Sequence, residues 1–191
     1  GAVSVDPSVI VWDGSSGQQL WRHEKTSYAS GAFTPDGHVV TYDQTAGLRL
    51  VEAATGKLVR PILSPNQSKF NGCDALAVGS AGLIAIADIQ RVVTVVDWQE
   101  GRVITRFEHQ VSGDRKIDHM AWAPDGEQLV TLIKSLDERH VLRLWDARKA
   151  SVLRSLLGGS GALTGLGLHP LSGEVLVSGR ASRAWDLTGQ M

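Results

Sequence analysis

The chain has 191 residues, and its 19 basic and 20 acidic side chains give a formal net charge of −1. This balance lacks the basic excess that binds nucleic acid or an anionic membrane. The single cysteine, Cys73, excludes an internal disulfide and a metal site made of several cysteines. With 42% hydrophobic residues and no apolar run of about 18 residues, we expect a folded globular domain with neither nucleic acid nor membrane as a partner.

The predicted elements are short β-strands, and one type of strand recurs along the chain. It is a run rich in β-branched and aliphatic residues that ends in an acid, and it occurs at residues 9–13, 48–52, 93–97, 142–146 and 182–186. The residue before the acid lies at positions 12, 51, 96, 145 and 185, so the steps are 39, 45, 49 and 40 residues. Short strands repeating about every 40–45 residues are typical of four-stranded propeller blades.

Turn residues repeat with the strands. Pro35-Asp36-Gly37 and Pro124-Asp125-Gly126 each precede the next acidic strand end by about 20 residues. Taken in chain order, the first unit has predicted strands 9–12 and 19–22, after a partial strand 2–5. The second has 27–33, 38–42, 48–52 and 57–62, and the third has 75–79, 83–87, 92–97 and 102–107. The fourth has 117–122, 128–133, 141–146 and 151–156, and the fifth has 162–168, 174–178 and 183–186. The fold class is therefore predicted to be all-β.

We expect a single propeller portion over residues 1–191, made of four-stranded antiparallel blades. Its predicted divisions are a partial blade 1–24, blades 25–62, 63–108 and 109–157, and a partial blade 158–191.

The motifs resemble the repeats of the WD-repeat β-propeller family. The residues that carry this signature are the pairs Trp12–Asp13, Trp145–Asp146 and Trp185–Asp186, together with the Pro-Asp-Gly turns. The resemblance covers essentially the whole chain and implies that His23 lies near the family's conserved histidine position, with Asp43 near its buried aspartate. The family's Gly-His pair is missing, and Val51 and Val96 replace tryptophan. We expect its Asp-His-Ser/Thr-Trp network to be incomplete in every blade.

Between four and five blades are predicted, whereas the family resemblance implies closed rings of six to eight. An arc of this size would leave an apolar sheet face open at each end. Three interpretations remain: the C-terminal part of a longer propeller chain, an arc completed by another chain or a second copy, and a tight four-blade ring.

No catalytic, cofactor or metal site is predicted. The six histidines show no H-x₃-H or HExxH spacing. The glycine-rich stretch 158–165 lacks the Lys-Ser/Thr of a phosphate loop and is interpreted as a flexible connection between blades. Cys73 is interpreted as a buried or half-buried thiol at the start of a strand.

One enzymatic alternative remains. The segment from Trp12-Asp13 through Gly17 to Trp21 also resembles the repeat of quinoprotein propellers, in which a tryptophan locks neighbouring blades. That resemblance implies a dehydrogenase fragment that binds pyrroloquinoline quinone beside calcium and a vicinal disulfide. The single cysteine and the single copy of the pattern argue against it.

We therefore expect a non-catalytic scaffold that binds proteins or peptides, with a cytoplasmic location and a sequence style typical of bacteria. The family resemblance implies a contact surface on the face that carries the B–C and D–A loops, where the strands of each blade are lettered A to D in chain order. The candidate contact residues there are Asp43, Arg115, Asp137, Glu138 and Arg139. Asp137 and Glu138 lie in the widest predicted B–C loop, 135–140.

Overall fold

The computed structural model describes residues 2–6, 8–23, 30–109, 114–135, 139–160, 163–169, 171–179 and 183–185. Almost every element in these ranges is a β-strand, and neighbouring strands pair antiparallel. The one described helix, α1 (Pro65–Ser68), has four residues. No helix in the described ranges is both long and apolar enough to cross a membrane.

The strands form five sheets, named here in chain order. The first sheet contains β1 (Ala2–Asp6), β2 (Ser8–Trp12) and β3 (Gln19–His23). The second contains β4 (Ser30–Phe33), β5 (His38–Asp43), β6 (Gly47–Glu52) and β7 (Leu58–Leu63). The third contains β8 (Ala75–Val78), β9 (Leu83–Ala87), β10 (Val92–Asp97) and β11 (Arg102–Glu108).

The fourth sheet contains β12 (Asp114–Trp122), β13 (Gln128–Ser135), β14 (Arg139–Asp146) and β15 (Ser151–Ser160). The fifth contains β16 (Leu163–Leu168), β17 (Val175–Gly179) and β18 (Arg183–Trp185). Each strand pairs with the next one along the chain, as in a propeller blade. The predicted all-β fold, with between four and five blade-like sheets, is confirmed.

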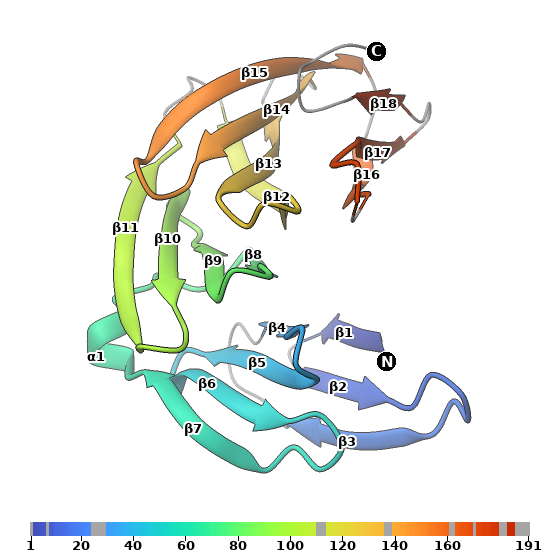
Figure 1. The fold of residues 1–191 in the computed structure, drawn as a ribbon, viewed down its shortest axis with the longest axis vertical. Coiled ribbons are helices and arrows are strands. Elements are labelled where there is room, and N and C mark those ends of the chain that lie inside the picture. The colour runs from blue at the N-terminus through green and yellow to red at the C-terminus, as the bar shows by residue number, and fades with distance from the viewer. Residues whose placement is uncertain are drawn as a thin grey trace.

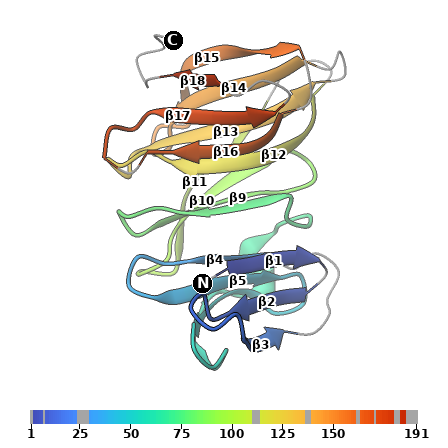
Figure 2. The same cartoon turned by 90° about the vertical axis from the view of Figure 1, so that its right-hand side faces the viewer.

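The sheets follow one another around an open arc (Figure 1). Strands β4, β8, β12 and β16 contact across neighbouring sheets on the inner side, and β7, β11 and β15 lie on the outer side. The first and fifth sheets stand apart at the two ends of the arc, near the N and C labels (Figure 1). Figure 2, turned by 90°, shows the sheets stacked one above another.

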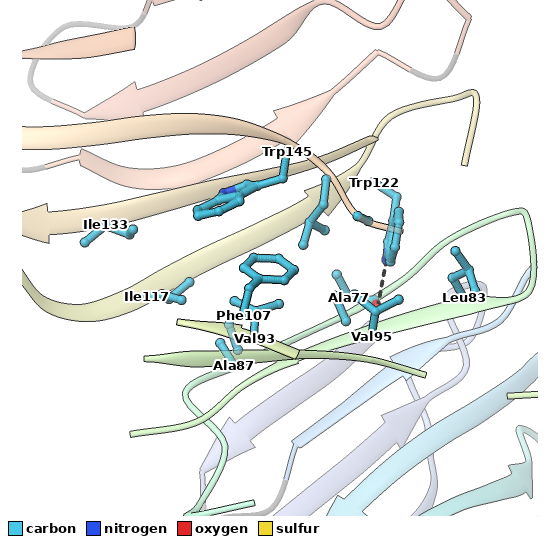
Figure 3. Close-up of a cluster of buried hydrophobic side chains, with 14 residues drawn as sticks. Ala77, Leu83, Ala87, Val93, Val95, Phe107, Ile117, Trp122, Ile133 and Trp145 are labelled. Atoms are coloured by element: carbon cyan, nitrogen blue, oxygen red, sulfur yellow. Dashed lines mark hydrogen bonds between the residues drawn. The ribbon is translucent and has the colours of Figure 1, made fainter. Parts of the chain in front are cut away.

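Apolar side chains fill the spaces between sheets. Between the third and fourth sheets, Trp145 is only 3% exposed and its ring lies 4.5 Å from that of Phe107 (Figure 3). The Trp122 indole N–H donates to the Ala77 carbonyl at 3.1 Å. A Cβ on Gly79 would lie 2.9 Å from the Trp122 ring, so this position accepts no larger residue without a shift of the ring. Rigid packing of this kind holds one sheet against the next.

Several predicted boundaries are corrected. β15 continues to Ser160, where it pairs with Arg139, so residues 158–160 are strand rather than a flexible connection. The predicted loop 135–140 is shorter, because β13 extends through Ser135 and β14 begins at Arg139. Helix α1 was not predicted, although Pro65 at its start and the spacing of Ser64 and Gln67 are local helix-start signals. In the structure the Ser64 N–H donates to Gln67 Oε1 at 3.0 Å. Residues 27–29 of the second unit lie outside the described ranges.

Candidate functional site

Three acids that end C strands, Asp13, Asp97 and Asp146, hold the turns that follow them. Oδ1 of Asp13 accepts from the N–H groups of Ser15 and Ser16, both at 2.8 Å. Asp97 and Asp146 bind the N–H groups two and three residues ahead in the same way, at 2.9–3.1 Å. Hydrogen bonds to the Ser15 hydroxyl and to nearby backbone lower the pKa of Asp13, and the Lys149 backbone N–H does the same to the pKa of Asp146. These acids therefore stabilise turns.

The signature tryptophans differ in environment. Trp145 is buried between sheets, whereas Trp12 is half-buried on the first sheet. Trp185 lies in β18, and nothing of its side chain is described. Asp186 lies outside the described ranges.

Of the five predicted contact residues, Asp43 has a side chain that the structure describes. Asp43 is only 2% exposed, and its carboxylate accepts from the backbone N–H groups of Thr45 and Ala46 at 2.7 and 3.0 Å. Asp43 therefore holds the β5–β6 turn, which leaves it little surface to offer a partner. Arg115 and Arg139 lie in β12 and β14, with side chains that are not described. Asp137 and Glu138 fall outside the described ranges.

A polar cluster, which sequence reasoning missed, occupies the fourth sheet. The Trp145 indole N–H donates to Thr131 Oγ1 at 3.0 Å, and the His109 ring packs edge-on against Trp145 at 5.2 Å. The Arg143 guanidinium donates to His109 Nδ1 at 3.0 Å and lies 5.9 Å from the Trp145 ring. Burial, and then the charge of Arg143, lower the pKa of His109 to about 3, so this imidazole is neutral near pH 7. The fourth sheet thus contains a buried hydrogen bond between a tryptophan and a threonine.

The second sheet repeats this arrangement with one large residue missing. Thr41 pairs with Arg49 across β5 and β6, as Thr131 pairs with Arg143 across β13 and β14. Two residues further along the strand, Val51 has the register position of Trp145. Thr41 therefore lacks the indole donor that Thr131 has.

A cavity of about 120 Å³ lies at this place, between β3 and the second sheet. Its lining includes His23, Thr41, Arg49 and Val51. The Arg49 guanidinium donates to His23 Nε2, which also lies 4.0 Å from Asp43 Oδ2. Burial is the main cause that lowers the pKa of His23, followed by the charge of Arg49. Thr41 Oγ1 and Arg49 Nε are both buried and have no hydrogen-bond partner.

The third sheet carries different residues at these positions. Ile86 and Thr94 stand at the register of the Thr41–Arg49 pair, and Ile84 and Val96 follow them. Ile84, Ile86 and Val96 belong to an apolar cluster there, whereas Thr94 is a buried polar residue. The pairing of a threonine with an arginine is therefore shared by the second and fourth sheets and is absent from the third.

Neighbouring sheets are also locked by a side chain of the outer strand. The Trp21 indole N–H donates to the Ala53 carbonyl of the second sheet at 2.8 Å. At the equivalent register Arg60 donates to the Trp98 carbonyl of the third sheet. In both cases the acceptor follows the acid of the next C strand.

Cys73 lies just before β8, partly buried, and its thiol donates to the Ala75 carbonyl at 3.5 Å. Burial raises the pKa of the Cys73 thiol to about 12, so it is unreactive at neutral pH. In the described part of the chain, no three His, Cys, Asp or Glu side chains gather as a metal ion would need.

No family model matches this chain, and no curated protein is found to match it. Functional conclusions therefore depend on the geometry of the chain itself.

Proposed function

We propose that this chain is a non-catalytic scaffold that binds proteins or peptides, as a WD-repeat-like portion of a propeller. The observation that carries the proposal is the open arc, whose end sheets each present a face that no other described sheet covers (Figure 1). Val9 and Val11 of β2 are buried towards the second sheet, so Ile10 and Trp12 alternate onto the open face and are half-buried there. At the other end, Val175 and Val177 pack against the fourth sheet, and Leu176 faces outward with 53% of its surface exposed.

Apolar side chains on unpaired sheet faces favour association with another protein surface. The natural cover for such a face is another blade, because every internal face of this arc is covered by one. The remaining blades would come from the same parent chain or from another chain. The cytoplasmic location expected from the sequence belongs to the same proposal.

The loop side of the third sheet supports a second contact surface. The segment after α1 and the β9–β10 turn are joined there: the Asn71 side-chain amide donates to Gln90 Oε1 at 2.7 Å, and the Ile89 N–H donates to the Asn71 carbonyl at 3.1 Å. Asp88 holds the same turn by accepting from the N–H groups of Gln90 and Val92, both at 2.9 Å. Loops fixed in this way present the exposed Ile89 with little ordering cost on binding. Arg115 in β12 and Arg139 in β14 remain candidate contacts within this proposal, as do Asp137 and Glu138, which lie outside the described residues.

The alternative, a quinoprotein-like dehydrogenase fragment, gains one observation. Trp21 locks the first sheet to the second, as the quinoprotein resemblance implies. Arg60 makes the equivalent lock in the next sheet, however, so the contact is a way of joining sheets and does not require a quinone. The chain also has only one cysteine and cannot form a vicinal disulfide by itself.

The test is the native mass of the chain by light scattering behind a sizing column, with far-UV circular dichroism to check the β-sheet content. We expect a mass above the 20.5 kDa of one chain that rises with concentration, because the open faces pair with each other when no other blade covers them. A stable β-rich monomer at all concentrations would contradict the proposal and favour a self-sufficient small domain.

A further inference from the structure

The cavity between β3 and the second sheet has the features of a built binding site. It is lined by Trp21, Arg22, His23, Thr41 and Arg49, with Val51, Thr55, Gly56 and Leu58. Thr41 is only 1% exposed, and its Oγ1 has no hydrogen-bond partner although the cavity offers room for one. A buried hydroxyl without a partner is costly, and most such groups in native proteins are satisfied by protein, water or ligand.

The fourth sheet shows what satisfies the equivalent hydroxyl. There Thr131 Oγ1 accepts from the Trp145 indole, which also lies beside the Arg143 guanidinium. In the second sheet Val51 is too small to reach either group, and Trp21 of the first sheet directs its indole N–H to Ala53 instead. The chain thus fills one of two equivalent sites with its own side chain and leaves the other as a cavity.

The buried polar groups that have no partner in this cavity are able to donate hydrogen bonds. Arg49 Nε is a buried donor with no acceptor, and the Thr41 hydroxyl is able to donate beside it across the β5–β6 pair. In the described part of the chain neither Arg49 nor Arg22 forms an ion pair. His23 accepts from Arg49 and is neutral near pH 7, so it does not balance the guanidinium charge. An acceptor that carries negative charge would complete this set.

The nearby acids indicate the charge of that ligand. Asp43 lies behind His23, and Glu52 lies behind Thr55, whose hydroxyl donates to Glu52 Oε2 at 2.6 Å. Neither acid lines the cavity. A doubly charged phosphate would be repelled by both carboxylates, whereas a singly charged carboxylate suffers half of that repulsion and still accepts two hydrogen bonds.

We propose that this cavity binds the carboxylate of a glutamate or aspartate side chain of a partner peptide, through Arg49 Nε–H and the Thr41 hydroxyl. The peptide source rests on the proposed scaffold function. The cavity lies at the junction of two sheets, so its occupation would also join the first sheet to the second.

The test is a titration of the isotopically labelled chain, followed by nuclear magnetic resonance at the Arg49 Nε–H. The probe is acetyl-alanyl-glutamyl-alanine amide, and its matched control is the glutaminyl peptide of the same shape. We expect a saturable shift with the glutamyl peptide and an affinity about tenfold lower with the glutaminyl peptide. Equal binding of the two peptides, or no saturable shift, would overturn the proposal.

Substitutions test whether the glutamyl peptide binds in this cavity. Arg49→Met and the nearly isosteric Thr41→Val should each weaken glutamyl-peptide binding by about tenfold. Arg143→Met is the matched control, because its equivalent site already contains Trp145, and it should leave the affinity unchanged. A loss as large in Arg143→Met as in Arg49→Met would overturn the assignment to this cavity. The wild-type comparison of two peptides holds even where a variant folds poorly.

Two further probes distinguish a peptide carboxylate from a free carboxylate and from phosphate as the ligand. Sodium acetate should bind more weakly than the glutamyl peptide, and inorganic phosphate more weakly still. Acetate as tight as the peptide would overturn the peptide source, and tighter phosphate would overturn the carboxylate. Because the titration uses the chain alone, a monomer that is stable at all concentrations and binds the glutamyl peptide would contradict completion of the arc by another blade and leave the cavity assignment intact.

Discussion

The turns after the C strands show how a single residue carries backbone strain. Of the four such turns that the structure describes, three contain glycine with positive φ: Gly17 at 70°, Gly56 at 70° and Gly101 at 66°. The fourth contains Ala150 at the same place with φ of 56°. An alanine in this left-handed region clashes with its own backbone, at a cost of about 1 kcal/mol.

Ala150→Gly should therefore stabilise the chain by roughly 0.5–1 kcal/mol, the loss of one partly buried methyl offsetting some of the relief. The measurement is the free energy of unfolding in urea. Gly17→Ala is the reverse control, since no atom lies within 4 Å of its added Cβ and only the backbone strain of about 1 kcal/mol would appear. An unchanged free energy of unfolding in both variants would contradict the strain.

His109 gives the fourth sheet a pH dependence. Its pKa falls from an ordinary 6.5 to about 3 on folding, chiefly because it is buried and also because Arg143 is near. Below pH 6.5 the unfolded chain takes up a proton that the folded chain refuses, so stability falls as pH drops from 6.5 towards 3 and falls no further below it. The slope is about 1.4 kcal/mol for each pH unit.

His109→Gln should make the free energy of unfolding fall less steeply between pH 6 and pH 4, by at most the slope that uptake of one proton contributes. The measurement is urea unfolding at a series of pH values. An identical slope for His109→Gln and the wild type would show that His109 does not titrate as its burial implies.

Among the elements, two outer strands each join the neighbouring sheet through one side-chain donor, Trp21 on β3 and Arg60 on β7. Trp21→Phe removes the indole N–H, keeps most of the ring and leaves the Ala53 carbonyl without this donor. We expect a loss of about 1 kcal/mol beyond the change in ring size. Trp98→Phe is the matched control, because the buried Trp98 N–H has no partner and its removal costs nothing. Equal destabilisation in urea unfolding of the two variants would contradict the lock.

The strands themselves could be predicted because alternation and turn chemistry are local. Gly37 and Gly126, the last residues of the two Pro-Asp-Gly turns, have the positive φ that such turns require. His109 could not be found in the same way, because it lies 13 residues before Trp122 while His23 lies 10 before Phe33. The longer connection in the fourth unit shifted the expected position.

The cavity between β3 and the second sheet could not be predicted from the sequence, for a different reason. Val51 marks a missing tryptophan in the sequence, but whether that place is filled depends on a residue from another sheet. Trp21 fills part of it and His23 another part, and only the structure shows Thr41 Oγ1 and Arg49 Nε left without partners. Of the predicted contact residues, Asp43 was expected near a buried aspartate position, and its burial limits its use as a contact.

At the scale of the whole molecule, the uncovered faces of the first and fifth sheets determine whether the arc is stable as a single chain. The internal faces that meet between the fourth and fifth sheets carry Leu142, Leu144, Val175 and Val177. Leu176 occupies the register of Val130, one of the buried residues on that internal face, yet no sheet covers it. A leucine in this position would pack against a further blade beside the fifth sheet.

Leu176→Glu should therefore lower the concentration-dependent mass seen by light scattering towards 20.5 kDa, because a carboxylate in the interface must be desolvated without a partner. The free energy of unfolding should change by less than about 0.5 kcal/mol, since the side chain is exposed within one chain. Leu171→Glu is the control: Leu171 is 88% exposed in a turn, away from the sheet face, and its replacement should leave the mass unchanged. If both variants reduced the mass equally, the association would follow net charge; if neither did, the fifth sheet would not be the surface that a further blade covers.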